Sequence, residues 1–236
     1  MKKIALYIIA IPLLFAACKS KCVEDLGIHS SKDLSLKPYD EIKVSGPIKL
    51  LLRQDSTYKL NIGADSSVIG MVKADVSGHE LTLKLDAEKY CGKDSIIITA
   101  GIGDLKKLSA AEAVKVYTTS KINLNDITIN LSGATLLKLD INAGKLTLNN
   151  DGAAAINLIG QAGAHVLKSK GTLNLDAFDF AAGIYDLDIE GAGKANINVL
   201  NDLKVRTTGA TEIYYKGNPK NVDEKKSGVS KLQKVN

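Results

Sequence analysis

The chain of 236 residues has no tryptophan and contains only three phenylalanines, eight tyrosines, three cysteines and three histidines. Few aromatic residues leave few flat faces on which a neutral sugar could stack. The histidines, His29, His79 and His165, are scattered, and no His, Cys or carboxylate group has the spacing of zinc ligands. We therefore expect no metal site and no cofactor.

The sequence also lacks a strong charge of one sign and the common catalytic motifs. A formal net charge of +5 is too mild to indicate nucleic acid as a partner. The segment Gly191–Lys194 lacks the four-residue spacer and the hydroxyl of a phosphate-binding loop, and Gly101–Gly103 lacks the third glycine of a dinucleotide site. There is no Gly-x-Ser-x-Gly elbow and no Cys–His pair, so we expect no catalytic residues and no enzymatic activity.

One long apolar run is present, from Ile4 to Phe15, between a basic start and the sequence Ala16-Ala17-Cys18. This is the pattern of a signal peptide that ends in a lipobox, and the run is shorter than the roughly 20 residues of a spanning helix. We predict that residues 1–17 are removed and that Cys18 is lipidated, which would hold the mature protein to a membrane. The alternative is an ordinary secretory peptide that leaves Cys18 in the mature chain.

Two further cysteines, Cys22 and Cys91, remain outside the cytoplasm, where disulfides are allowed. A bridge between them and two free thiols are equally compatible with the sequence, because the distance between their Cα atoms is not known at this point. Cys22 lies in the polar segment 18–33, which we expect to be a tether.

From Leu105 onward, one glycine marks each short unit at intervals of 18 to 20 residues. Alternating apolar residues precede and follow each glycine, as in Ile127–Leu131 and Leu137–Ile141, and strict alternation is typical of a strand with one buried face. The marker glycines are Gly133, Gly152, Gly171, Gly191, Gly209 and Gly228.

A unit of about 19 residues with two short strands cannot bury its apolar face alone, but stacked units can. We therefore predict an all-β fold: a parallel β-helix, or β-solenoid, over residues 105–236 with a C-terminal cap. Glycines would form the corners, and asparagines near the turns would form ladders between coils. An antiparallel β-sandwich is the competing fold, although it does not explain the even spacing of the glycines.

Residues 34–104 form a less regular N-terminal β part with no recognisable linker to the repeats. Asp65 could cap a short helix that runs to about Lys73, although Gly70 disfavours it. This part is either a small lobe packed on the solenoid or its first, distorted coils. We expect strands at residues 42–44, 48–52, 58–62, 81–85 and 96–100.

Three stretches of the chain resemble one known family: Tyr39–Gly46, the Ser/Thr-Gly-Ala repeats, and the ending Ile213–Pro219 followed by Lys226–Gly228. The family is that of the auto-transporter adhesin head GIN domain, found among envelope lipoproteins of Bacteroidetes. The resemblance covers about residues 35–234 and implies a right-handed β-helix on an outer-membrane lipoprotein that faces the periplasm or the cell surface. It supplies no catalytic residues.

Two functions follow as hypotheses. The first is a non-catalytic binding or adhesion role with a glycan or a surface protein as ligand, because a solenoid offers a long surface with side chains in register. Phe178, Phe180 and Tyr185 would form the first ligand patch if exposed, although core packing of the two phenylalanines is the favoured interpretation.

The second hypothesis is a polysaccharide-cleaving enzyme on a β-helix scaffold, which rests on analogy of fold alone. Such an enzyme needs a pair of carboxylates at a set separation. Alternating acids are also typical of any solvated strand, and this interpretation is favoured. The candidate acids are Asp176, Asp179, Asp186, Asp188 and Glu190.

Overall fold

The computed structural model describes residues 22–87, 89–93 and 95–236, so the predicted signal peptide and Cys18 lie outside the described residues. Nearly all of the described chain is β-strand. The elements are β1 His29–Ser35, β2 Glu41–Ser45, β3 Ile48–Gln54, β4 Lys59–Asp65, the 3-10 turn η1 Ile69–Met71, β5 Val72–Ser77, β6 Glu80–Leu85, β7 Ile96–Ile102, β8 Lys107–Glu112, β9 Lys115–Thr118, β10 Ile122–Lys216 and β11 Asn221–Lys234.

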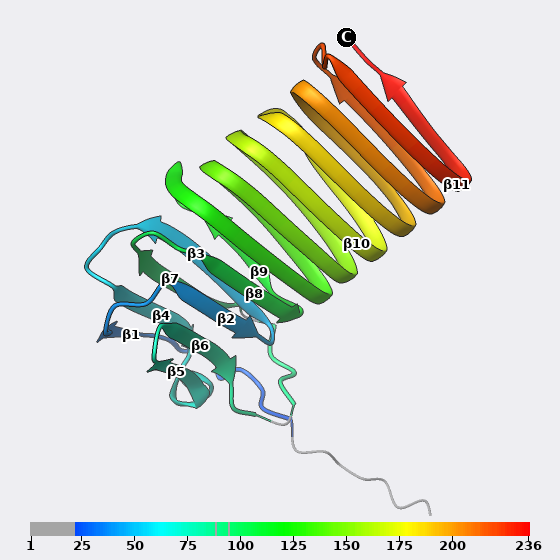
Figure 1. Cartoon of the computed structure of the whole chain (residues 1–236). Coiled ribbons are helices and arrows are strands. Elements are labelled where there is room, and N and C mark those ends of the chain that lie inside the picture. Colours follow the sequence, from blue (N-terminus) through cyan, green and yellow to red (C-terminus); the bar gives the residue numbers. More distant parts are fainter. Residues whose placement is uncertain (1–21, 88, 94) are drawn as a thin grey trace, which may run out of the picture.

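Strand β10 runs for 95 residues and winds in successive turns that lie side by side, each of which we call a pass (Figure 1). Its neighbours pair with it in parallel, and in β11 the register runs from Asp202 opposite Asn221 to Tyr215 opposite Lys234. Side-chain hydrogen bonds within β10 also join residues 19 positions apart, such as Asn149 and Asn130. One pass therefore contains about 19 residues, which is the length of the repeat in the sequence.

The marker glycines lie on top of one another, as the sequence predicts. A Cβ atom on Gly171 would collide with the backbone of Gly152, and its φ of +130° lies in the region that favours glycine. The same contact recurs along the stack at Gly152 over Gly133, Gly191 over Gly171, Gly209 over Gly191 and Gly228 over Gly209.

The core lies inside the passes and continues into the N-terminal strands. Alternate residues of each pass are buried, for example Leu137, Leu139 and Ile141, and the residues between them face outward. The burial of each pass against the next supplies the apolar contacts that one unit of this length cannot make alone.

All strands belong to one mixed sheet whose order is β1-β4-β7-β3-β9-β10-β8-β2-β6-β5, with β11 added to β10. The sheet is open at β1 and β5. Strands β2 and β3 pair in parallel with β8 and β9, so the N-terminal part shares the hydrogen bonding of the passes. The all-β prediction is confirmed.

Among the described strands, antiparallel pairing occurs in the N-terminal part, outside residues 105–236, for which the sequence predicts a parallel helix. Strands β1, β4 and β5 pair antiparallel with their neighbours β4, β7 and β6. The connection from β5 to β6 is the tight turn Gly78-His79, and a connection of this length joins antiparallel strands only, whereas parallel strands need a long crossover.

The helix expected from Asp65 to Lys73 is wrong. Its place is taken by the single 3-10 turn η1, after which Val72 is extended and opens β5. The Asp65 carboxylate instead holds a turn: it accepts hydrogen bonds from the Ser67 amide at 2.9 Å and from the Ile28 amide at 3.0 Å. Strand pairing of β5 and the low helix propensity of Gly70 outweigh the capping signal.

The segment expected to be a tether, residues 18–33, is also partly structured. His29–Ser35 forms β1 and pairs with β4 over its whole length, from His29 opposite Asp65 to Ser35 opposite Lys59. The polar composition of this segment reflects an exposed edge strand, whose outer face is solvated.

At the other end of the molecule, β11 places charges at inward positions. Glu224 lies opposite the buried Val205 and Lys226 opposite the buried Thr207, and the two charged side chains form an ion pair at 3.3 Å. Inward-facing charges at a sheet edge disfavour the addition of another strand.

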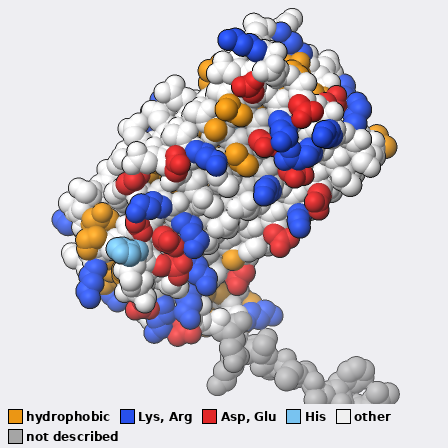
Figure 2. All heavy atoms as spheres, in the orientation of Figure 1, with side chains coloured by type: hydrophobic (Ala, Val, Ile, Leu, Met, Phe, Trp, Pro, Cys, Tyr) orange, Lys and Arg blue, Asp and Glu red, His pale blue; other side chains and the backbone are white. Residues whose placement is uncertain are grey.

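The surface carries both signs of charge. On the face in Figure 2, Lys and Arg side chains are intermixed with Asp and Glu, both over the N-terminal strands and over the last passes of β10. The described residues contain no helix with the length and apolarity that a membrane-spanning segment needs.

Candidate binding site

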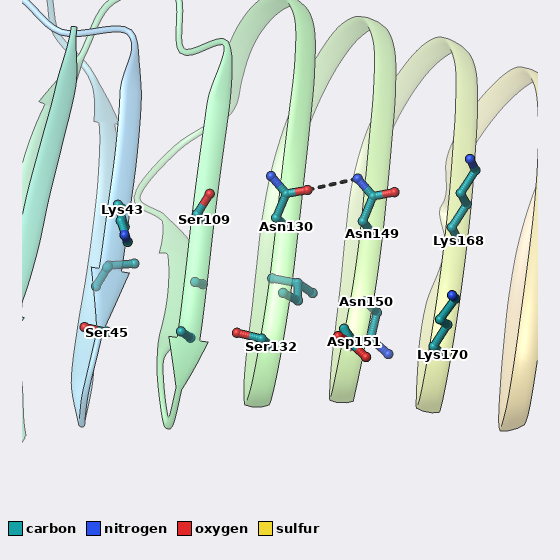
Figure 3. A pocket seen from close by; sticks show the side chains of 14 residues that line it. Lys43, Ser45, Ser109, Asn130, Ser132, Asn149, Asn150, Asp151, Lys168 and Lys170 are labelled. Carbon is teal, nitrogen blue, oxygen red and sulfur yellow. Dashed lines mark hydrogen bonds between the residues drawn. The ribbon is translucent and has the colours of Figure 1, made fainter. Parts of the chain in front are cut away.

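A trough of about 500 Å³ crosses the outer face of the sheet at right angles to the strands. We call it the transverse trough; it runs over β2, β8 and the passes of β10 that contain Asn130, Asn149 and Lys168 (Figure 3). Figure 3 shows the outward side chains Lys43, Ser45, Ser109, Asn130, Ser132, Asn149, Asp151, Lys168 and Lys170 along it, and the register adds Ala111 opposite Ser45.

The parallel register arranges these side chains in rows. Lys43 lies opposite Ser109, and Ser109 lies opposite Asn130. The row continues to Asn149, whose Nδ2 donates a hydrogen bond to Oδ1 of Asn130 at 2.9 Å, and then to Lys168 (Figure 3). Because neighbouring strands are in step, each row is a straight line of side chains across the sheet.

A second row lies two residues further along each strand. Ser45 lies opposite Ala111, which lies opposite Ser132, and Asp151 and Lys170 continue the line (Figure 3). The residues between the two rows, Val44, Ala110 and Leu131 among them, are buried in the core. The alternation of the strand thus fixes which side chains reach the trough.

Lysines stand at both ends of the trough. Lys43 is at one end, Lys168 and Lys170 are at the other, and all three are exposed. Among the described residues, none of the three forms an ion pair. Four strand-to-strand steps separate Lys43 from Lys168, which amounts to roughly 19 Å at about 4.8 Å per step.

Several charges beside the trough are already paired. At the Lys43 end, Lys107 donates a hydrogen bond to Glu41 at 3.0 Å, and this carboxylate raises the pKa of Lys107. Beyond the Lys168 end, Arg206 contacts Asp186 at 2.9 Å and Asp188 at 3.4 Å. These pairs offset Glu41, Asp186 and Asp188. Glu190, which is exposed and lies next to Lys170, forms no ion pair among the described residues, so the three lysines of the trough still outnumber the unpaired acids near them.

The backbone of the trough floor is committed to the sheet. Strand β8 pairs with β2 on one side and with β10 on the other, so its amides and carbonyls bond to neighbouring strands. A ligand in the trough therefore meets side chains rather than a free strand edge, and strand addition is excluded as the mode of binding there.

The three aromatic residues considered as a ligand patch are not exposed together, and core packing, the favoured interpretation, holds for Phe180 but only in part for Phe178. Phe180 and Tyr185 are fully buried, and the Tyr185 hydroxyl donates a hydrogen bond to the Phe180 carbonyl at 3.1 Å. Phe178 is half-buried, and the ammonium of Lys216 lies 4.5 Å from its ring centre. The chain changes the direction of its side chains between Ala177 and Phe180, so the two phenylalanines do not share a face.

One of the scattered histidines lies deep in the core. His165 is fully buried against Phe180 and Tyr185, with ring centres 5.8 Å and 5.1 Å away, and neither ring nitrogen has a hydrogen-bond partner. Burial disfavours the charged imidazolium and lowers the pKa of His165 to about 3.

Cys22 and Cys91 are bonded to each other in the structure, with their Cα atoms 5.8 Å apart. Backbone hydrogen bonds support the same junction, from the Val23 amide to the Lys89 carbonyl at 3.0 Å and from the Cys91 amide to the Val23 carbonyl at 2.9 Å. The start of the described chain is thereby fastened to the loop before β7.

The acids considered for catalysis have different neighbours. Asp186 and Asp188 both contact Arg206, whereas Asp176 lies in the segment after Gly171, where Asn157 donates a hydrogen bond to it at 3.5 Å. In the described parts of the chain, no group of three or more His, Cys, Asp and Glu residues is arranged to hold a metal ion.

The trough was not identified from the sequence, although a signal for it exists. Asn130, Asn149 and Lys168 each lie three residues before a marker glycine. Ser132, Asp151 and Lys170 each lie one residue before the same glycines. Alignment of the repeats on their glycines, followed by reading down each outward column, would have found both rows.

Solved structures with the same fold come from related bacteria. A crystal structure described as a "putative adhesin" from Bacteroides fragilis has a TM-score of 0.84 at 20% identity, covering 90% of this chain and 100% of that one. A "putative lipid binding protein" from Parabacteroides distasonis has a TM-score of 0.69 at 19% identity, covering 92% and 100%. A "putative adhesin" from Parabacteroides merdae has a TM-score of 0.69 at 23% identity, covering 91% and 99%.

No match was found among curated proteins. A family model, in contrast, matches residues 38–219, which include the trough, the glycine stack as far as Gly209 and most of the N-terminal strands. The chain belongs to the family described as "Putative auto-transporter adhesin, head GIN domain".

Proposed function

We propose that this protein is a non-catalytic binding module of the cell envelope, with a β-solenoid body and a lipid on Cys18 that anchors it to the outer membrane. Its ligand is an extended glycan or a protein chain held in the transverse trough. The observation that carries the proposal is the trough itself, in which two straight rows of side chains cross β2, β8 and β10.

The body suits an extended ligand because its side chains repeat at a fixed spacing. Parallel register and stacked glycines keep equivalent positions of successive passes in line, as in a solenoid. A ligand that runs across the strands then meets Ser109, Asn130 and Asn149 in turn, each presenting a polar group at the same height. The adhesin description of the family favours the same role.

The anchor and the disulfide together would set the position of the body. Four peptide steps separate Cys18 from Cys22, which span at most about 14 Å when fully extended. Cys22 is joined to Cys91, so the N-terminal strands would be held close to the membrane surface. The passes of β10 then extend from this fixed end.

The enzyme hypothesis has less support. Arg206 contacts both Asp186 and Asp188, so these carboxylates are engaged in ion pairs on an outer face. The trough itself contains one acid, Asp151, whereas hydrolysis of a glycosidic bond uses a pair.

A binding screen tests the proposal. Full-length protein in detergent micelles is applied to an array of envelope glycans and to envelope protein extracts, and the same polysaccharides are assayed for new reducing ends. We expect binding without cleavage. New reducing ends that depend on the protein, or a lack of binding to every glycan and protein, would contradict the proposed function.

The site of anchoring has its own test. Cys18→Ala should abolish labelling of the protein by metabolic palmitate, and protease treatment of whole cells should then report which side of the membrane the body faces. Unchanged labelling of the variant would rule out the lipid anchor on Cys18.

A further inference from the structure

We infer that the ligand of the transverse trough is an acidic polysaccharide, a chain of sugars that carries carboxylate or sulfate groups. The inference rests on the proposed binding function and names the chemistry of its ligand. Three features of the trough lead to it: the residues it lacks, the position of its lysines, and the polar groups of its floor.

No aromatic residue lines the trough. Neutral sugars are held largely by stacking their C–H faces on aromatic rings, which supply much apolar contact at low entropic cost. The outward side chains of the trough are alanine, serine, asparagine, aspartate and lysine. Most of the exposed lining is carbon but it offers no ring face, so the direction and specificity of binding must come from charge and hydrogen bonds. A neutral glycan would gain little here, whereas an acidic one would gain ion pairs.

The lysines fit a chain rather than a small anion. Lys43 and the pair Lys168 and Lys170 are separated by about 19 Å, which is too far for one carboxylate or sulfate to contact both ends. An extended chain with an acidic group on successive sugars would reach both. Lys168 and Lys170 also lie two residues apart on one strand, on the same face, and can share one stretch of the chain.

The floor between the lysines offers groups that both donate and accept hydrogen bonds. The bond between Asn149 and Asn130 uses one polar atom of each carboxamide and leaves the amino group of Asn130 and the carbonyl oxygen of Asn149 for a ligand. The hydroxyls of Ser109 and Ser132 have the same dual capacity. Sugar hydroxyls, which also donate and accept, match such a floor.

A protein ligand fits this floor less well. Extended peptides commonly bind to sheets by pairing with a free edge, and the backbone of β8 is paired on both sides. One acid, Asp151, lies in the second row next to Lys170. Its carboxylate can accept a hydrogen bond from a sugar hydroxyl, and it leaves the trough with an excess of positive charge.

The inference is tested with oligosaccharides of defined charge and length. Full-length protein in detergent micelles is titrated with oligogalacturonates from disaccharide to decasaccharide, with sulfated carrageenan oligosaccharides, and with neutral cello-oligosaccharides of equal length. We expect the acidic chains to bind and the neutral chains not to. Affinity should rise with length until the chain reaches from Lys168 to Lys43, and it should fall as salt is added.

A variant inside the trough and a matched variant outside it test where the acidic chains bind. The double variant Lys168→Gln/Lys170→Gln should weaken binding of the acidic chains roughly tenfold, the sum expected for two exposed ion pairs. Lys138→Gln removes an exposed lysine outside the trough and should change the affinity less than about twofold. Thermal unfolding of each variant confirms that the fold is kept.

The outcomes separate this inference from the proposed function. If a neutral glycan or a protein binds and the double variant leaves that affinity unchanged, the acidic ligand is wrong while the binding role stands. If acidic chains bind equally to wild type and to the double variant, the trough is not their site. If no glycan or protein of any class binds, both the inference and the proposed function fail.

Discussion

Asn149 donates a hydrogen bond from Nδ2 to Oδ1 of Asn130, 2.9 Å away and 19 residues earlier in the chain. The same offset joins Asn142 to Asn123, and Asn221 to Asp202. These bonds repeat at the period of the passes and tie each pass to the next. In the trough, the bond also aligns the row of side chains on which the proposed binding depends.

The first prediction concerns the bond between Asn130 and Asn149. The single variants Asn130→Ala and Asn149→Ala should each destabilise the protein, and a double-mutant cycle should give a coupling free energy of about 0.5–1 kcal/mol, since both side chains are half-buried. Denaturant unfolding measures it. The control Asn174→Ala, at an exposed position, should change the free energy of unfolding by less than about 0.5 kcal/mol. Purely additive effects of the two single variants would show that the bond contributes nothing.

The second prediction concerns the glycine stack. Gly171→Ala should lower the free energy of unfolding by about 2 kcal/mol or more, because the new Cβ would collide with the backbone of Gly152 and φ is positive there. Gly70→Ala is the matched control, since nothing lies within 4 Å of its Cβ position. That change should be neutral or slightly stabilising. Equal effects of the two substitutions would contradict the stacking.

The repeat made much of this fold predictable from sequence. Periodic glycines and alternating apolar residues indicate strands, buried faces and corners at once, and Gly152 does lie over Gly133. The antiparallel strands β1 and β5 were not predictable in the same way, because they are single elements at the end of the sheet and no period constrains them. The helix predicted from Asp65 was wrong because a carboxylate that caps a turn cannot be distinguished in the sequence from one that caps a helix.

The site was less predictable than the fold. Core packing was the favoured interpretation for both Phe178 and Phe180, but a corner between Ala177 and Phe180 breaks the alternation and leaves Phe178 half-buried. The trough depends on Lys43 and Lys168, which are far apart in the sequence. Their place in one row can be recognised only when the parallel register of the strands is known. The proposed function rests on the stacking of the chain and not on a local motif.

The third prediction concerns the disulfide between Cys22 and Cys91. The double variant Cys22→Ser/Cys91→Ser should lose about 2–4 kcal/mol of stability, because the bridge closes a loop across 69 residues of sequence and restricts the unfolded chain. Urea unfolding with and without a reducing agent measures the loss. A reductant should destabilise the wild type and leave the double variant unchanged. If the wild type and the double variant unfold at the same urea concentration, the bridge contributes no stability.

The fourth prediction concerns acid and His165. Its pKa is about 3 in the fold and about 6.5 in the unfolded chain, so unfolding takes up a proton as the pH falls below 6.5. The stability from the neutral ring is fully present above pH 6.5, and about 2 kcal/mol of it should be lost by pH 5. His165→Leu should remove this dependence between pH 7 and pH 5, whereas His79→Gln, at an exposed position, should keep it. An unchanged pH dependence in His165→Leu would refute the assignment.

The most direct test of the account follows side-chain amide signals by NMR while an acidic oligosaccharide is added to the full-length protein. Asn130 and Asn149 lie in the trough, whereas Asn157 and Asn196 line grooves elsewhere on the body. The Nδ2 resonances of Asn130 and Asn149 should shift in proportion to occupancy, while those of Asn157 and Asn196 should stay in place. Shifts confined to Asn157 and Asn196, or no shifts at saturating oligosaccharide, would contradict it.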